Sequence, residues 1–187
     1  MIYFVTHPEV VIDPAVPVPQ WPLSEIGRAR MEAFAGKLVR VDAIYTSTER
    51  KALDGGEIVA RRFALTPRSD PRLGENGRES TGYIAPPEFW EVVAQFFARS
   101  HESVRGWERA VDAQARIVTA VGEIAARERG ETIIVSHGGV GRLLMAHVQG
   151  VEIGRDAAPP NPYGGCFMVL RADVALAQGW RAIEDFP

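Results

Sequence analysis

Short apolar runs alternate with longer segments of helical periodicity along most of the chain. Apolar and β-branched runs predict buried strands at Ile2–Val5, at 41–47 ("VDAIYTS") and at 131–137 ("ETIIVSH"). Apolar positions at helical spacing predict helices over about 24–38, 48–63, 87–100, 107–129 and 138–150. Ser24 is placed to cap the first helix, whereas Gly55 and Gly56 weaken the middle of the second.

The C-terminal stretch, residues 164–186, predicts two further strands that are joined by a turn near Gln178 and Gly179. Strands that alternate with helices are typical of a parallel sheet, because parallel neighbours need a crossover connection that is usually a helix. We therefore expect an α/β domain with a mostly parallel sheet.

Two segments between these elements have the composition of loops. Residues 13–22 contain four prolines ("DPAVPVPQWP") and predict a stiff, partly polyproline-like connection. Residues 66–87 are rich in glycine, proline and charge, and predict a long loop. Because long loops in compact domains are commonly functional or disordered, the second segment is a place to look for site residues.

Length and charge set the broad class of the protein. At 187 residues, of which 46% are hydrophobic, the chain can bury one core and is short for two, so we expect a single domain over 1–187. A net charge of −3 gives no electrostatic footprint for nucleic acid or for an anionic membrane. Met1 leads straight into a strand pattern, without a targeting or membrane-spanning stretch, which favours a cytoplasmic protein. The oligomeric state is left open.

Two of the predicted strands end in histidine. His7 follows the first strand and His137 follows "ETIIVS", and α/β domains bind ligands at the carboxyl ends of parallel strands. Gly138 and Gly139 come next, at the start of a helix, where free backbone N–H groups and the helix dipole favour an anion. Two interpretations stay open: a shared anion site, or ordinary loop histidines with glycines that only allow a tight turn.

One carboxylate in the predicted loop is a further candidate. The stretch "RLGENG" (72–77) offers Glu75 as an ionisable group flanked by glycines, although a carboxylate on a loop is usually just solvated. A metal site made of His7, Glu75 and His137 has suitable ligand types but no supporting local spacing.

Five segments together resemble the histidine phosphatase superfamily, also called the phosphoglycerate mutase-like family. They are "IYFVTHPE", "PLSEIGRARMEAFAGKL", "IYTSTERKALDGGEIVA", "RLGENG" and "TIIVSHGGVGRLLMAH". The segments occur in the family's order and at its approximate spacing, and they cover most of the chain. The resemblance implies a three-layer α/β/α sandwich with helices on both faces of the sheet, and a small helical cap inserted at about 81–105.

The resemblance also implies roles for individual residues. His7 matches the nucleophile that takes the phosphoryl group onto a ring nitrogen, Glu75 matches the general acid, and His137 matches the histidine that binds the phosphoryl oxygens. The residues expected to bind the substrate are Thr6, Asp13, Arg50, Lys51 and Gly138. No metal or other cofactor is implied, because positioning and charge stabilisation supply most of the catalysis in phosphoryl transfer.

Four positions depart from the family pattern. Thr6 and Lys51 stand where the family has arginines, Pro8 where it has glycine, and Asp13 where it commonly has asparagine. Each lost charge-assisted hydrogen bond is worth about 1.5–3 kcal/mol, and lysine lacks the planar fork of arginine. Arg50 matches the site only after a one-residue shift. The other cations that can compensate are Arg72, Arg78 and Arg142.

The sequence favours one function and leaves another open. The favoured function is a metal-independent phosphomonoesterase of the histidine acid phosphatase type, which acts through a phosphohistidine on a small phosphorylated metabolite or a phosphoprotein. The alternative is a catalytically weakened or inactive family member that serves as a phospho-ligand binding or regulatory module. A phosphoglycerate mutase is not expected, because the chain has room for only a small cap.

Overall fold

The computed structural model describes residues 1–155, 158–161 and 163–187. Its strands are β1 (Ile2–Thr6), β2 (Ala43–Thr46), β3 (Arg68–Ser69), β4 (Thr132–Ser136), β5 (Cys166–Leu170) and β6 (Leu176–Ala182). Its α-helices are α1 (Glu25–Lys37), α2 (Arg50–Phe63), α3 (Glu88–Ala98), α4 (Ala110–Arg127) and α5 (Gly138–Gln149). Each strand and helix predicted from the apolar pattern is confirmed, with its ends shifted by a few residues.

The six strands form one sheet in the order β3-β2-β4-β1-β5-β6. The first four strands in this order run parallel, whereas β5 and β6 pair antiparallel at the other side. Strands β2, β4 and β5 are buried along their full length, as expected for strands covered on both faces. The prediction of a mostly parallel sheet is confirmed.

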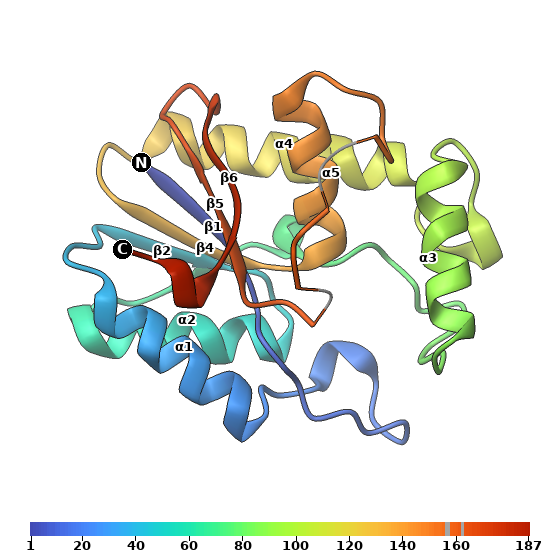
Figure 1. Ribbon diagram of the computed structural model, residues 1–187, viewed down its shortest axis with the longest axis horizontal. Helices are drawn as coiled ribbons and strands as arrows, with labels where there is room; N and C mark the ends of the chain where they lie inside the picture. The colour runs from blue at the N-terminus through green and yellow to red at the C-terminus, as the bar shows by residue number, and fades with distance from the viewer. Residues whose placement is uncertain (156–157, 162) are drawn as a thin grey trace.

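Helices cover both faces of this sheet (Figure 1). Helices α1 and α2 pack on one face, where Val5, Ile44 and Val135 point. Helices α4 and α5 pack on the other face, where Phe4 and Ile134 point. The alternation of neighbouring residues between two cores follows from the two-residue period of a strand, and it confirms the three-layer α/β/α arrangement.

Local signals in the sequence explain where one helix begins and how closely another packs. The hydroxyl of Ser24 accepts a hydrogen bond from the backbone N–H of Gly27 at 3.0 Å, so Ser24 caps α1 as predicted. In α2, Gly56 also has a role in packing. A Cβ on Gly56 would lie 2.2 Å from Cγ2 of Thr46, so the glycine lets α2 approach β2 closely.

The predicted turn near Gln178 and Gly179 is wrong. These two residues lie inside β6, and the chain reverses at 171–175, where the N–H of Arg171 bonds to the carbonyl of Ala175. Asp173 accepts a hydrogen bond from the N–H of Ala175, and Val174 takes a positive φ. The aspartate thus makes the turn, while Gly179 is accommodated in a strand whose pairing with β5 is interrupted by register shifts.

The two predicted loops contain little regular structure. Residues 13–22 hold one short 3₁₀ helix, Val18–Gln20, and residues 66–87 hold β3 and the 3₁₀ helix Pro71–Leu73. The two-residue strand β3 escaped prediction because it has no apolar alternation of its own; both of its residues are exposed at the edge of the sheet.

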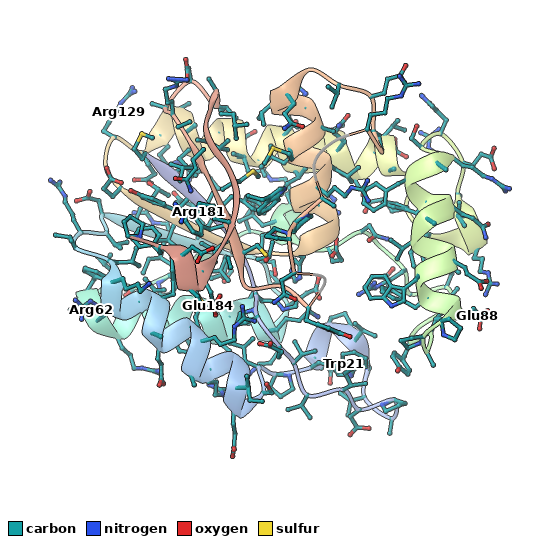
Figure 2. All side chains as sticks on the ribbon, viewed as in Figure 1. Trp21, Arg62, Glu88, Arg129, Arg181 and Glu184 are labelled. Carbon is teal, nitrogen blue, oxygen red and sulfur yellow. The ribbon has the colours of Figure 1, made fainter. Side chains whose placement is uncertain are left out.

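Helix α3 lies beside the layers rather than on a face of the sheet (Figure 1). Phe96 and Phe97 are buried, and the ring of Phe96 lies 6.2 Å from that of Trp107, just before α4. Trp21 of the proline-rich segment is on the side of the molecule where Glu88 begins α3 (Figure 2), and its ring lies 5.3 Å from that of Tyr83. Within the described part of the chain, no helix has both the length and the apolar character needed to cross a membrane.

Candidate functional site

The topology brings His7 and His137 together. Each follows one of two neighbouring parallel strands, β1 and β4, and the N–H of His7 continues their pairing by bonding to the carbonyl of Ser136 at 3.0 Å. After β1 the chain goes to the face that carries α1, and after β4 it goes to the opposite face with α5. In α/β sheets, ligands bind at such a switch point, at the carboxyl ends of the strands. The two imidazole centroids lie 5.1 Å apart there.

The ring of His7 is held by its own neighbour. Nδ1 lies 2.8 Å from the carbonyl oxygen of Pro8, which can only accept, so Nδ1 carries the proton and Nε2 presents a lone pair. Burial and the positive charge of Lys51 lower the pKa of His7 from 6.5 to about 4. At neutral pH the ring is therefore neutral, as a nucleophilic nitrogen must be.

The backbone behind His7 is packed against Gly164 and Gly165. The N–H of Gly165 lies 3.1 Å from the carbonyl oxygens of Thr6 and His7. A Cβ on Gly164 would lie 1.9 Å from the carbonyl oxygen of His7, and φ of this residue is +83°. Only glycine satisfies both conditions, so the chain entering β5 fixes the position of the His7 backbone.

His137 is completely buried. Its Nε2 lies 2.7 Å from the hydroxyl of Ser47 and 3.3 Å from Oε1 of Glu49. Its Nδ1 has no hydrogen-bond partner among the described residues. Burial lowers the pKa of His137 well below its ordinary value, although the negative charge of Glu49 acts in the opposite direction.

Glu75 lies at the N-terminus of α5. Its carboxylate oxygens accept hydrogen bonds from the N–H groups of Gly139 and Val140, both at 3.0 Å. Arg116 of α4 shapes the preceding loop by donating to the carbonyl oxygens of Arg72, Gly74 and Glu75. The structure thus brings Glu75 to the helix that begins behind His137. The N–H of Gly138 has no partner within the described part of the chain.

Lys51 and Glu49 form a buried ion pair next to the two histidines. Nζ of Lys51 lies 2.6 Å from Glu49 and donates to the carbonyl of Val18 at 2.9 Å. The charges of Lys51 and Glu49 both act on the pKa of His7. Burial alone would raise the pKa of Glu49, but the neighbouring His137 and Lys51, together with the hydrogen bond from the N–H of Glu75, outweigh it and hold that pKa well below its usual range.

Glu49 is a site residue that the sequence reasoning missed. Its carboxylate accepts a hydrogen bond from the N–H of Glu75 at 2.9 Å, in addition to its contacts with Lys51 and His137. Glu49 directly precedes α2 and stands two residues before the lysine that matches the family's arginine. The sequence did carry one signal for Glu49: it is an acidic residue two positions before Lys51, the cation expected to bind phosphate.

Three expected substrate-binding residues are engaged elsewhere. Oγ1 of Thr6 is buried and exchanges hydrogen bonds with the backbone N–H and carbonyl of Cys166. Asp13 accepts from the N–H of Ala15 in the exposed loop, and Arg50 pairs with Asp54 at 2.8 Å. The structure does not bring the side chains of Asp13 and Arg50 into contact with either histidine.

Of the arginines considered as compensating cations, Arg78 is the one whose charge reaches the histidines. It contributes to lowering the pKa of both His7 and His137, after burial and Lys51. Its guanidinium lies over the rings of Phe89 and Trp107, at 5.3 and 5.9 Å, and makes no hydrogen bond or ion pair with any residue that the structure describes. Arg72 instead pairs with Asp70 and Glu123, and Arg142 lies over Phe97.

The part of the chain that the structure describes contains no group of three or more histidine, cysteine, aspartate or glutamate residues arranged to hold a metal ion. What it does contain is a neutral imidazole at His7, the buried histidine His137, an uncommitted N–H at a helix N-terminus and two nearby cations. Helix N-termini and cations bind anions, so the arrangement suits a tetrahedral anion such as a phosphoryl group.

Known structures share this fold. Bacillus stearothermophilus YhfR is 27% identical, with a TM-score of 0.77 over 95% of this chain and 94% of that chain. The mycobacterial glucosyl-3-phosphoglycerate phosphatase Rv2419c is 21% identical, with a TM-score of 0.70 over 96% and 95%. TTHB049 from Thermus thermophilus is 18% identical, with a TM-score of 0.69 over 97% and 98%. A comparison with curated proteins gives no significant match.

The sequence itself matches the family described as the histidine phosphatase superfamily (branch 1) over residues 3–171. The match includes His7, Lys51, Glu75 and His137, and it extends from β1 through β5. The chain therefore belongs to the histidine phosphatase superfamily.

Proposed function

We propose that the protein is a metal-independent phosphomonoesterase that transfers the phosphoryl group of its substrate to Nε2 of His7. One observation carries the proposal: Nδ1 of His7 is fixed on the carbonyl of Pro8, which leaves the lone pair of Nε2 beside His137. Superfamily membership supports it, as does the likeness to a fold that includes the mycobacterial phosphatase Rv2419c. We propose a small phosphorylated metabolite or a phosphoprotein as the substrate.

The reaction has two steps. Nε2 attacks phosphorus, the bond between phosphorus and the ester oxygen breaks, and the leaving oxygen takes a proton from the carboxyl group of Glu75. Water then attacks the phosphohistidine and gives its proton to Glu75, which releases inorganic phosphate and restores His7. To act in this way, Glu75 exchanges one of its contacts with the N-terminus of α5 for the leaving oxygen.

Positive charge for the transition state comes from several groups in this scheme. In this scheme the ammonium of Lys51 and the guanidinium of Arg78 are the cations. The N–H of Gly138 and the unpartnered Nδ1 of His137 are further polar groups for the phosphoryl oxygens. These groups replace the family's arginine, because the hydroxyl of Thr6 is bonded to Cys166. Electrostatic stabilisation of this kind is usually the largest single contribution to catalysis.

The test is hydrolysis of a panel of phosphate esters in the presence of EDTA, combined with trapping of the phosphorylated protein. His7→Asn should lower kcat by about 10³-fold or more and abolish labelling. His147→Asn, a change at an exposed position late in α5, is the matched control and should have no effect. Arg78→Gln should lower kcat/KM by about 10- to 100-fold, the value of one charge-assisted contact. Equal activity of wild type and His7→Asn, or a label on another residue, contradicts the proposal.

A second candidate function is supported by the ion pair between Lys51 and Glu49 and by the engaged hydroxyl of Thr6. Both features reduce the charge available for phosphoryl transfer, which suits a module that binds a phospho-ligand without turning it over. The same experiment separates the two: binding of inorganic phosphate without hydrolysis of any ester in the panel favours the binding module.

A further inference from the structure

The carboxylate of Glu49 contacts residues from three segments of the chain. It contacts Nε2 of His137 after β4, Nζ of Lys51 in α2 and the N–H of Glu75 in the loop, at 3.3, 2.6 and 2.9 Å. Its side chain is 13% exposed, against 3% for Lys51 and 0% for His137. A carboxylate this deeply buried must be matched by donors or positive charge, and here it has both.

The geometry of His137 decides on which side of the ring Glu49 lies. Glu49 and Ser47 meet Nε2, whereas Nδ1 is buried without a partner among the described residues. These nitrogens are on separate edges of the imidazole ring, so Nδ1 is available to an anion while Glu49 stays at Nε2. The contact with Glu49 therefore does not compete with an anion at Nδ1.

We propose that Glu49 is a positioning residue that holds Lys51 in place and allows His137 to become an imidazolium when a tetrahedral dianion binds. In that state Nε2–H donates to Glu49 and Ser47, and Nδ1–H donates to the anion. The proton comes from solvent and returns to it when the anion leaves. This supplies the positive charge that Thr6 does not carry, and it rests on the proposed function of the same site.

The charges around His137 explain why this ring is protonated only when the anion binds. Burial disfavours the imidazolium, as do the positive charges of Lys51 and Arg78 and, when it is protonated, His7, whereas Glu49 favours it. The N-terminus of α5, which directly follows His137, adds a further positive partial charge, to which Glu75 is bound. In the free protein these influences keep the pKa of His137 well below its ordinary value. A bound dianion adds two negative charges next to Nδ1, and the imidazolium form of His137 then becomes the favoured one.

Calorimetry of sulfate binding tests this proposal, because sulfate is a tetrahedral dianion that does not itself take up protons near neutral pH. Titrations in two buffers with different ionisation enthalpies give the number of protons taken up on binding. We expect about one proton for the wild type near pH 7, and close to none for Glu49→Gln, with sulfate bound about tenfold or more weakly by the variant. Glu49→Asp keeps the charge, so it should retain most of the proton uptake even where its shorter side chain weakens binding.

Glu128→Gln is the matched control, since Glu128 is a part-buried carboxylate paired with Arg68 and Tyr45. It should behave like the wild type. The proposal is overturned if the wild type binds no sulfate or takes up no proton, or if Glu49→Gln binds sulfate as tightly with the same uptake. Should Glu49→Gln fail to fold, an Asp variant without proton uptake overturns it. The measurement needs no turnover, so it is independent of whether His7 becomes phosphorylated.

Discussion

At the scale of single residues, Pro8 departs from the family pattern and yet holds the ring of His7 in place. It removes the N–H that a glycine would offer at this position, but its carbonyl binds Nδ1 of His7 and so determines which ring nitrogen is free. The sequence predicted His7 as nucleophile through the family resemblance. Which nitrogen is free to attack in the proposed reaction depends on a contact of 2.8 Å, and no pattern in the sequence reports that distance.

The titration of His7 is a direct prediction. With its pKa lowered to about 4 by burial and by Lys51, the ring is neutral above that value and loses its lone pair as the pH falls through it. The rate of phosphoryl transfer to His7 should therefore be retained down to about pH 5 and fall below it. Proton NMR of the ring resonances measures the midpoint.

Lys51→Met provides the internal check on this titration. Removal of the ammonium takes away one of the two main influences that lower the pKa of His7, so the midpoint should move up toward 6.5. A wild-type midpoint already near 6.5, or one that Lys51→Met leaves in place, would show that Lys51 does not act on His7 as described.

Other residues of the site show the same limit of sequence reasoning. Thr6 stands where the family has an arginine, and Arg50 is one residue away from another such position. Yet the hydroxyl of Thr6 bonds to Cys166, 160 residues away, and Arg50 pairs with Asp54. Glu49 fits no part of the pattern and makes three contacts in the site. Side-chain direction depends on neighbours that are distant in sequence, and a single sequence does not reveal them.

At the scale of elements, the packing of α2 on β2 depends on one small residue, Gly56. Gly55 and Gly56 have low helix propensity, so the sequence predicted a weak helix here. The structure shows α2 intact from Arg50 to Phe63, with Gly56 against Thr46. Burial of the helix against the sheet outweighs propensity, since most helical stability in proteins comes from tertiary packing.

Gly56→Ala tests this packing. Its Cβ would lie 2.2 Å from Cγ2 of Thr46, so α2 or β2 must shift, and we expect a loss of about 1–3 kcal/mol in the free energy of unfolding. Gly122→Ala in α4 is the control, because no described atom beyond its own turn of helix lies within 4 Å of its Cβ position. That variant should gain up to about 1 kcal/mol from propensity alone. Urea unfolding measures both; equal effects of the two substitutions would rule out the proposed role of close packing.

At the scale of the whole molecule, acid should weaken the fold in two separate ranges of pH. His7 and His137 are both held neutral by burial, with pKa values below those of an unfolded chain. The unfolded chain therefore binds more protons, and the free energy of unfolding falls as the pH drops from about 6.5 toward 4. Carboxylates with lowered pKa values, such as Asp70 and Glu184, lose their contribution only at lower pH.

Urea unfolding at about pH 7.5 and about pH 5 measures how far the free energy of unfolding falls in the range governed by the histidines. His7→Asn cannot titrate, so the difference in unfolding free energy between the two pH values should be smaller in this variant than in the wild type. The same difference in both proteins would mean that His7 does not contribute to the pH dependence of stability.

The sequence by itself determined the order of strands and helices, the α/β class and the family, because apolar periodicity and the segments around His7, Glu75 and His137 are local signals. It misplaced the turn before β6 and missed β3, since those depend on Asp173 and on pairing with β2 rather than on their own pattern. Only the tertiary structure decided how the site is charged. Strand order brings His7 beside His137. Glu49 and Lys51 at the start of α2, and Arg78 from the loop before α3, reach the two histidines only after folding.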